Sequence, residues 1–160
     1  MTKNKSVIVV GGGAAGLMSA IHSAWSGAEV IIFEKNSRPA RKVLITGKGR
    51  CNVTNNCSIE TVMNNTPTNP KFLYSALNRF SPEDTMSFFE MLGVELKTER
   101  GNRVFPVSDK AKDIVDALIN CAESAGCSIY EKNIKSLIIE NNTIKGVKDS
   151  NGVEYFADSV

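Results

Sequence analysis

Two short apolar runs flank a helical pattern at the start of the chain. Residues Ser6–Val10 are rich in β-branched side chains and stop abruptly at Gly11–Gly13, which is typical of a buried strand. From Ala14, small and apolar residues recur at helical spacing, and a second apolar run, Val30–Phe33, ends on Glu34. The order strand, helix, strand predicts a parallel pair of strands joined by a right-handed crossover.

A long insertion separates this pair from the next parallel strand, which is predicted at Cys127–Tyr130. The connection is far longer than a simple crossover requires, so we expect it to hold structure of its own. A serine, a proline and two acidic residues at 81–84 are typical of a helix start, and this helix is expected to run to Leu92. Another helix is expected to start at Ser108 and to end before Gly126.

The last part of the chain alternates apolar runs with turns that contain asparagine. The pairs Asn141-Asn142 and Asn151-Gly152 favour the positive φ angles of tight hairpins. They separate three candidate strands, and an antiparallel β-meander is predicted over Ile134–Ile139, Thr143–Val147 and Val153–Phe156. The pattern as a whole predicts an α/β fold in which a parallel sheet precedes a meander.

The composition is that of a globular protein with an ordinary surface. Of the 160 residues, 42% are hydrophobic and 22% are charged, and the formal net charge is +2. This charge is too small, and the basic residues are too dispersed, to predict binding to nucleic acid or to a membrane surface. The start of the chain has some features of a signal peptide, but consecutive glycines break its apolar run, so a cytoplasmic location is predicted.

The four cysteines do not form a metal-binding or disulfide pattern. Cys51 and Cys57 are separated by five residues, and so are Cys121 and Cys127, whereas zinc ligands favour about two to four. The chain has a single histidine, His22. No metal site is predicted, and the thiols are expected to be reduced.

The first strand leads into the glycine pattern of a dinucleotide site. Gly11, Gly13 and Gly16 form G-x-G-x-x-G at the start of the predicted helix, and the next strand ends on an acid. Gly11 permits the tight turn, Gly13 lets the backbone approach a pyrophosphate, and Gly16 lets the helix pack closely on the strand. The helix start favours a diphosphate, and Glu34 is suited to accept hydrogen bonds from ribose hydroxyls. The motif predicts an ADP moiety, which FAD and NAD both carry.

A second motif lies just beyond the ribose-binding acid, where residues 39–55 read PARKVLITGKGRCNVTN. Its basic pair is suited to neutralise phosphate, and its glycines would let the backbone approach a flat ring system; a solvated basic loop is the alternative interpretation. With VVGGGAAGLMSA at 9–20, FSPEDTMSFFEMLGV at 80–94 and RVFPVSDKA at 103–111, the whole chain resembles a family of bacterial flavoproteins. These are the aminoacetone-oxidase-like, NAD(P)/FAD-dependent oxidoreductases, whose relatives include a dehydro-bile-acid reductase. Family members usually have glycine in place of Ala40 and often in place of Lys48.

The resemblance implies the Rossmann-like FAD-binding fold of the glutathione-reductase type, with FAD as the cofactor. It assigns no catalytic residue in this chain, because the flavin itself would carry the redox chemistry. The implied contacts are those of Gly11, Gly13, Ala14, Ala15 and Gly16 with the pyrophosphate, Glu34 and Lys35 with the ribose, Arg41 and Lys42 with a phosphate or sugar, Thr46, Gly47, Arg50, Cys51 and Asn52 with the flavin side, and Ile134 with the adenine edge.

The predicted function is the FAD-binding portion of a flavin-dependent oxidoreductase. Its partners would be a small-molecule substrate and NAD(P)H or oxygen as the redox partner. Two alternatives stay open. One is a flavin disulfide reductase that uses Cys51 and Cys57, although such enzymes space their cysteines by four residues. The other is a dinucleotide-binding module without catalysis.

The chain is expected to be the N-terminal part of an FAD-binding domain. Its predicted parts are a dinucleotide motif at 1–35, an insertion at 36–126, and a third strand with the meander at 127–160. A substrate domain and a C-terminal FAD segment are expected beyond Val160. Without them, we expect the apolar side chains Ile8, Val10 and Ile32 to be incompletely covered.

Overall fold

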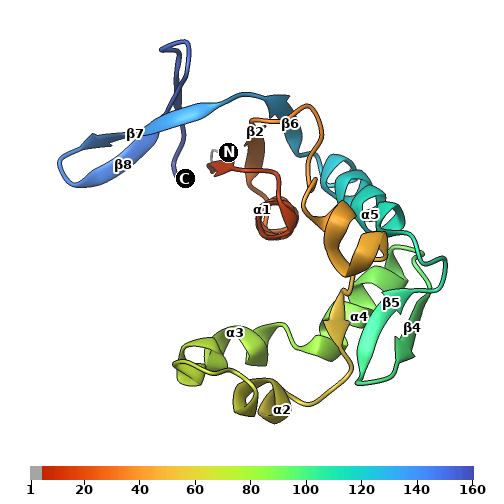
Figure 1. The fold of residues 1–160 in the computed structure, drawn as a ribbon. Coiled ribbons are helices and arrows are strands. Elements are labelled where there is room, and N and C mark those ends of the chain that lie inside the picture. The colour runs from red at the N-terminus through yellow and green to blue at the C-terminus, as the bar shows by residue number, and fades with distance from the viewer. Residues whose placement is uncertain (1–4) are drawn as a thin grey trace. The chain divides into compact units, whose positions relative to one another are not determined.

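The computed structural model describes residues 5–160, and the chain divides into two units (Figure 1). Among the described residues, one unit consists of residues 5–43 and 118–160, and the other of residues 44–117. The first four residues of the predicted segment 1–35 lie outside the described residues. The parallel sheet and the meander belong to the first unit, and the chain forms the second unit between the second and third parallel strands.

Three parallel strands form the sheet of the first unit, in the order β1-β2-β6. They and the crossover helix are β1 (Ser6–Val10), α1 (Ala14–Trp25), β2 (Glu29–Glu34) and β6 (Ser128–Glu131). The register pairs Val7 with Val30 and Val10 with Phe33, so β1 and β2 end at the same edge of the sheet. The predicted strand, helix, strand unit and the third strand are confirmed, and the turn after β1 lies beside the carboxyl end of β2.

The meander follows β6 directly and is antiparallel in the order β7-β8-β9. Its strands are β7 (Ile134–Glu140), β8 (Thr143–Asp149) and β9 (Glu154–Phe156). Asn141 and Asn142 have φ angles of 48° and 58°, as the predicted tight hairpin requires. The buried carboxylate of Asp149 accepts hydrogen bonds from the N–H groups of Asn151 (2.8 Å) and Val153 (3.0 Å), which fixes the second turn.

The meander and α1 pack on the apolar side chains of the parallel strands. Ile8 and Phe33 form a cluster with Val147 of β8, and the rings of Phe33 and Tyr155 lie 4.7 Å apart. Alternation along β2 directs Ile32 to the other face of the sheet from Phe33, and α1 packs on β1 and β2.

The expectation of incomplete cover is therefore wrong for two of its three residues. Ile8 is 2% exposed and Ile32 is 0% exposed, because the meander and α1 supply the contacts that the prediction assigned to a later domain. Val10 is 49% exposed, as expected. It is the last residue of β1, where the chain turns away from the sheet.

The segment after β9 returns to the outer edge of β1. Ser159 forms a parallel bridge with Val7, and the N–H of Ile8 donates to the carbonyl oxygen of Ser159 at 3.0 Å. The backbone N–H and the hydroxyl of Ser6 donate to Oδ2 of Asp158 at 2.8 and 2.9 Å. Strand β1 thus has backbone partners along both of its edges.

The second unit combines short helices with an antiparallel sheet of order β3-β5-β4. Helix α4 packs on β3 and β4. The elements are η1 (Val43–Gly49), β3 (Thr54–Asn55), α2 (Ile59–Asn64), η2 (Pro70–Leu73), α3 (Tyr74–Arg79), α4 (Pro82–Met91), β4 (Leu96–Glu99) and β5 (Arg103–Pro106), followed by α5 (Ala111–Ser124), which ends in the first unit. The sequence pattern did not predict this sheet or the helices α2 and α3. The strands have two to four residues and the two helices six residues each, which is too short for a usable alternation or helical period.

Both helices that were predicted in the insertion are present. Helix α4 begins with a capping box, in which the N–H of Asp84 donates to the hydroxyl of Ser81 (3.1 Å) and the N–H of Ser81 donates to the Asp84 carboxylate (2.8 Å). Helix α5 begins at Ala111 rather than at the predicted Ser108. The reason is Asp109, whose φ of 59° lies outside the helical region.

Candidate cofactor-binding site

The turn between β1 and α1 brings the start of the helix to the carboxyl edge of the parallel sheet. Gly11 has a φ of 99°, which favours glycine, and its N–H donates to the carbonyl oxygen of Phe33 at 2.8 Å. Gly13 precedes the helix in an extended conformation, and the N–H of Leu17 makes a helical bond to the Gly13 carbonyl at 2.9 Å. The turn is therefore tied to β2 on one side and opens into α1 on the other.

The fold excludes a side chain at Gly16 but leaves space for one at Gly13. A Cβ atom on Gly16 would lie 1.9 Å from the carbonyl oxygen of Gly11, so the packing of helix on strand excludes any side chain there. A Cβ atom on Gly13 would meet nothing within 4 Å, and the φ of −74° at this position suits any residue. The fold requires Gly16, whereas only a ligand that approaches the backbone would require Gly13.

The first turn of α1 presents backbone donors at this open side. The N–H groups of Ala14, Ala15 and Gly16 precede the first intrahelical bond, so helix geometry leaves them without an acceptor in the helix. Gly13, Ala14 and Ala15 are exposed. Together with the partial positive charge of the helix end, these donors fit a diphosphate group.

The carboxylate of Glu34 joins the end of β2 to the glycine turn. It is 8% exposed, and its Oε2 accepts a hydrogen bond from the N–H of Gly12 at 2.8 Å. Its Oε1 accepts from the N–H of Asn36 at 2.9 Å and from the Asn36 side-chain amide at 2.5 Å. Burial acts to raise the pKa of Glu34, but these donors outweigh it and hold the pKa below the ordinary value of 4.5. A carboxylate has further lone pairs, so Glu34 can accept from a ribose while it holds the turn.

A glutamine at position 34 tests this role of the carboxylate. The amide NH₂ of Glu34→Gln would face a backbone N–H, and we expect a loss of about 1–3 kcal/mol in the free energy of unfolding at pH 7. The folded-state pKa of Glu34 is lowered, so its contribution is complete above pH 4.5 and is lost as the pH falls through the folded value. Urea denaturation should show the difference between the two proteins shrinking below pH 4.5. A difference that is independent of pH would show that the charge of the Glu34 carboxylate does not stabilise the fold.

Asn36 and Arg41 extend the network beyond Glu34. Nη1 of Arg41 donates to Oδ1 of Asn36 at 3.1 Å, which places the guanidinium close to the predicted ribose site. Asn36 was not among the predicted site residues. Two features of the sequence could have indicated it: Asn36 follows the acid by two residues, and its side chain can donate and accept hydrogen bonds at once.

The remaining basic residues of the predicted ADP site are Lys35 and Lys42, and both are exposed. The chain between them is tied to the turn, because the N–H of Ala40 donates to the Gly12 carbonyl at 2.8 Å. Ala40 is buried with a φ of 54°. This left-handed conformation favours glycine, which the resembling family usually has at this position.

The predicted flavin-side residues lie in the second unit, within and just after η1. Gly47 has a φ of 53°, and a Cβ atom on it would lie 3.0 Å from the N of Asn52 and 3.1 Å from Cε1 of Phe105, so the position requires glycine. Thr46 and Asn52 are exposed, whereas Cys51 is buried. The side chain of Arg50 forms ion pairs with Glu99 and Asp109. This leaves backbone and the exposed Thr46 and Asn52 as the groups that can meet a ligand.

The comparison with known protein families agrees with this geometry. A family model described as the HI0933-like protein Rossmann domain matches residues 5–160. The chain belongs to this family. The predicted family and the Rossmann-like FAD-binding fold are thereby confirmed, and the match supports FAD as the cofactor.

Curated relatives of this HI0933-like domain are enzymes. The chain is 36% identical over 112 residues to the 3-dehydro-bile acid Δ(4,6)-reductase of Clostridium scindens, covering 69% of this chain and 27% of that protein. It is 33% identical over 116 residues to the ribosomal RNA dihydrouridine synthase of Escherichia coli, covering 72% and 28%. The chain thus spans under a third of the length of these relatives.

A solved structure with the same fold is the 3-ketosteroid-Δ4-(5α)-dehydrogenase of Rhodococcus jostii RHA1. The TM-score is 0.69 at 15% identity, and the match covers 96% of this chain and 44% of that one. The fold of the HI0933-like domain is therefore shared with an oxidoreductase of low sequence identity.

Ile134 was predicted to lie at the adenine edge. The structure places it at the first position of β7, partly buried against the cluster of Ile8, Phe33 and Val147. Its side chain serves the core of the HI0933-like domain. Its backbone contact with adenine stays a prediction.

The geometry does not favour the alternative of a redox disulfide. Cys51 and Cys57 are both free thiols. Burial raises the pKa of Cys51, although a hydrogen bond with Thr46 acts in the opposite sense. A thiol that is buried and less readily ionised is a poor partner in thiol–disulfide exchange.

Among residues 5–160, no group of three or more His, Cys, Asp and Glu side chains is placed to hold a metal ion.

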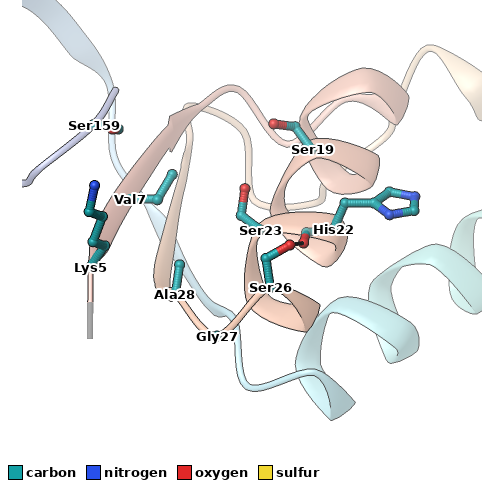
Figure 2. Close-up of a pocket in the computed structure, with 9 residues that line it drawn as sticks. All are labelled: Lys5, Val7, Ser19, His22, Ser23, Ser26, Gly27, Ala28 and Ser159. Carbon is teal, nitrogen blue, oxygen red and sulfur yellow. Dashed lines mark hydrogen bonds between the residues drawn. The ribbon is translucent and has the colours of Figure 1, made fainter. Parts of the chain in front are cut away.

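A separate open pocket lies at the other end of α1. Figure 2 shows its lining, in which Ser19, His22, Ser23 and Ser26 come from α1 and the residue after it, and Lys5 and Val7 from around the start of β1; the ring of His22 points away from Lys5. In parallel sheets, ligands bind at the carboxyl ends of the strands, so this pocket lies at the wrong edge for the cofactor.

Within residues 5–160, no helix has the length and apolar character needed to cross a membrane.

Proposed function

We propose that this chain holds the ADP half of FAD and is the FAD-binding portion of a flavin-dependent oxidoreductase. The observation that carries the proposal is the open approach to Gly13, which lies between the free N–H groups of α1 and the carboxylate of Glu34. Nothing in the fold demands a glycine at position 13, whereas a pyrophosphate in contact with the backbone would.

Every predicted contact residue except Arg50, whose side chain pairs with Glu99 and Asp109, has a role in this proposal. The backbone of Gly13, Ala14, Ala15 and Gly16 binds the pyrophosphate, and the Gly11 turn permits this approach. Glu34, with Lys35 and Arg41 beside it, binds the adenosine ribose; Lys42 neutralises phosphate, and the backbone of Ile134 meets the adenine. Thr46, Gly47, Cys51 and Asn52 receive the flavin side. When bound, FAD supplies the hydride or electron transfer.

The names of the two relatives point to one class of reaction. A 3-dehydro-bile acid with Δ(4,6) unsaturation has a carbon–carbon double bond conjugated with its ketone. Uridine has such a bond conjugated with a ring carbonyl, and dihydrouridine is its reduced product. We therefore infer that the whole protein reduces a carbonyl-conjugated double bond of a small molecule, with NAD(P)H as the electron donor.

The four free thiols support the cytoplasm as its compartment.

Anaerobic reduction and reoxidation test this function. We expect the purified protein to be yellow, to lose its flavin absorbance with NADH or NADPH, and to regain it on addition of a 3-oxo-Δ4,6-steroid. The saturated 3-oxo-steroid is the matched control and should leave the flavin reduced. Reoxidation by unmodified ribosomal RNA instead of the steroid would make RNA the substrate, as in the E. coli relative. Reoxidation by oxygen alone would contradict the proposed reaction class.

A further inference from the structure

The flavin-side loop, residues 46–52, has a backbone conformation that is locally unfavourable. Gly47 and Gly49 have φ angles of 53° and 83°, and Lys48 and Cys51 have φ angles of 59° and 60°. The left-handed region is unfavourable for the two residues that are not glycine. Such a conformation persists only where the surrounding structure imposes it, and such positions concentrate at ligand sites.

The side chain of Arg50 ties this loop to two other segments of the second unit. Its Nε donates to Oδ1 of Asp109 at 2.7 Å, and its Nη2 pairs with Asp109 and with Oε1 of Glu99. Glu99 ends β4 and Asp109 follows β5, so one guanidinium joins segments 49 and 59 residues away in the chain. The planar guanidinium, with its fixed set of donors, suits such a bridge.

Lys97 closes the same cluster from β4. Its Nζ lies 2.8 Å from Oδ2 of Asp109 and 3.6 Å from Oε1 of Glu99. Two cations and two carboxylates therefore balance one another; the side chains of Arg50, Lys97 and Glu99 are partly buried, and that of Asp109 is exposed. The network is more than an isolated surface pair, whose contribution would be small.

The ring of Phe105 packs against two residues of the loop, Arg50 and Gly47. The guanidinium carbon of Arg50 lies 4.1 Å from the centroid of the Phe105 ring, which is a cation–π contact. The same ring lies beneath Gly47, where an added Cβ would be 3.1 Å from Cε1. Phe105 is buried, so its position is fixed by the core of the second unit.

We propose that Arg50, Glu99 and Asp109 are positioning residues that hold the backbone of residues 46–52 in the conformation that receives the flavin side of the cofactor. This rests on the proposed function, because the contact between this loop and the flavin is part of it. Arg50 was predicted to touch the cofactor, whereas here it acts through the loop. Glu99 and Asp109 had no assigned role.

Hydrogen exchange and flavin binding together test the proposal in the purified protein. We expect Arg50→Gln to speed amide exchange in residues 46–52 by about ten-fold or more in the absence of FAD, because the loop loses its anchor. FAD affinity should fall by about ten-fold, and the shape of the visible flavin spectrum should change. Arg50→Lys should change amide exchange and FAD binding less than Arg50→Gln does, since lysine keeps the charge but lacks the forked donors. Asp109→Asn removes charge while Arg50 stays, and should act in the same direction more weakly.

The control is Glu154→Gln, which breaks the Lys148–Glu154 pair (2.9 Å) of similar exposure in the first unit, and it should change neither measurement. Unchanged loop exchange in both Arg50→Gln and Asp109→Asn would overturn the proposal. So would faster exchange with an unchanged flavin spectrum and affinity, because the loop would then not receive the flavin. Failure of the unsubstituted protein to bind FAD would be a separate result, and it would overturn the proposed function on which the inference rests.

Discussion

Replacing Gly16 by alanine is expected to cost the protein about 3 kcal/mol or more in the free energy of unfolding, at the upper end of overpacking effects. The new methyl group would lie 1.9 Å from the carbonyl oxygen of Gly11, and no side-chain rotation can relieve a clash with backbone. Helix α1 would have to move away from β1. This loss is a large part of the total stability of an ordinary domain.

Thermal unfolding measures this effect, and Gly13→Ala is the matched control in the same turn. A loss of 3 kcal/mol should lower the melting temperature by about 6–12 °C for a chain of this size. Gly13→Ala adds the same methyl group into open space and should cost about 1 kcal/mol or less, from the weaker helix cap alone. Equal melting temperatures for the two variants would mean that the packing at Gly16 is not as tight as described.

A valine at position 13 should have the opposite profile, with the fold kept and FAD binding lost. The extended backbone at Gly13 suits a β-branched residue, and its Cβ atom would have no neighbour within 4 Å in the protein. The side chain would instead occupy the space through which a pyrophosphate reaches the N–H groups of α1. We expect FAD affinity to fall by about 100-fold or more, equivalent to about 2.7 kcal/mol. Ser19→Val puts the same side chain on the exposed face of α1 and should leave FAD affinity unchanged.

The parts of the site that could be predicted from sequence are those that local chain geometry determines. Gly11, Gly13 and Gly16 follow a strand and open a helix, so their spacing alone carries the geometry of the turn. Glu34 ends the next strand, and a parallel crossover brings that end back to the turn. The hairpins of the meander were equally accessible, because Asn141 and Asn142 are suited to left-handed backbone.

The parts that escaped prediction depend on contacts between distant residues. Arg50 finds its partners 49 and 59 residues later in the chain, and no local pattern connects them. The sheet β3-β5-β4 is made of strands too short to show a period. Glu34 shows a subtler limit, since the sequence indicates a ribose ligand but not that the same carboxylate holds the N–H of Gly12. A group that serves both fold and ligand has only one of its roles visible in the motif.

The central claim is that the turn after β1 binds the ADP half of FAD, and comparison of FAD with FMN tests it most directly. FMN carries the same flavin but lacks the adenosine and one of the two phosphates. Calorimetric titration of the purified apoprotein should show FAD binding about 100-fold or more tighter than FMN, and Gly13→Val should remove most of that preference. Equal affinities for FAD and FMN in the unsubstituted protein, or a full preference retained in Gly13→Val, would contradict the claim.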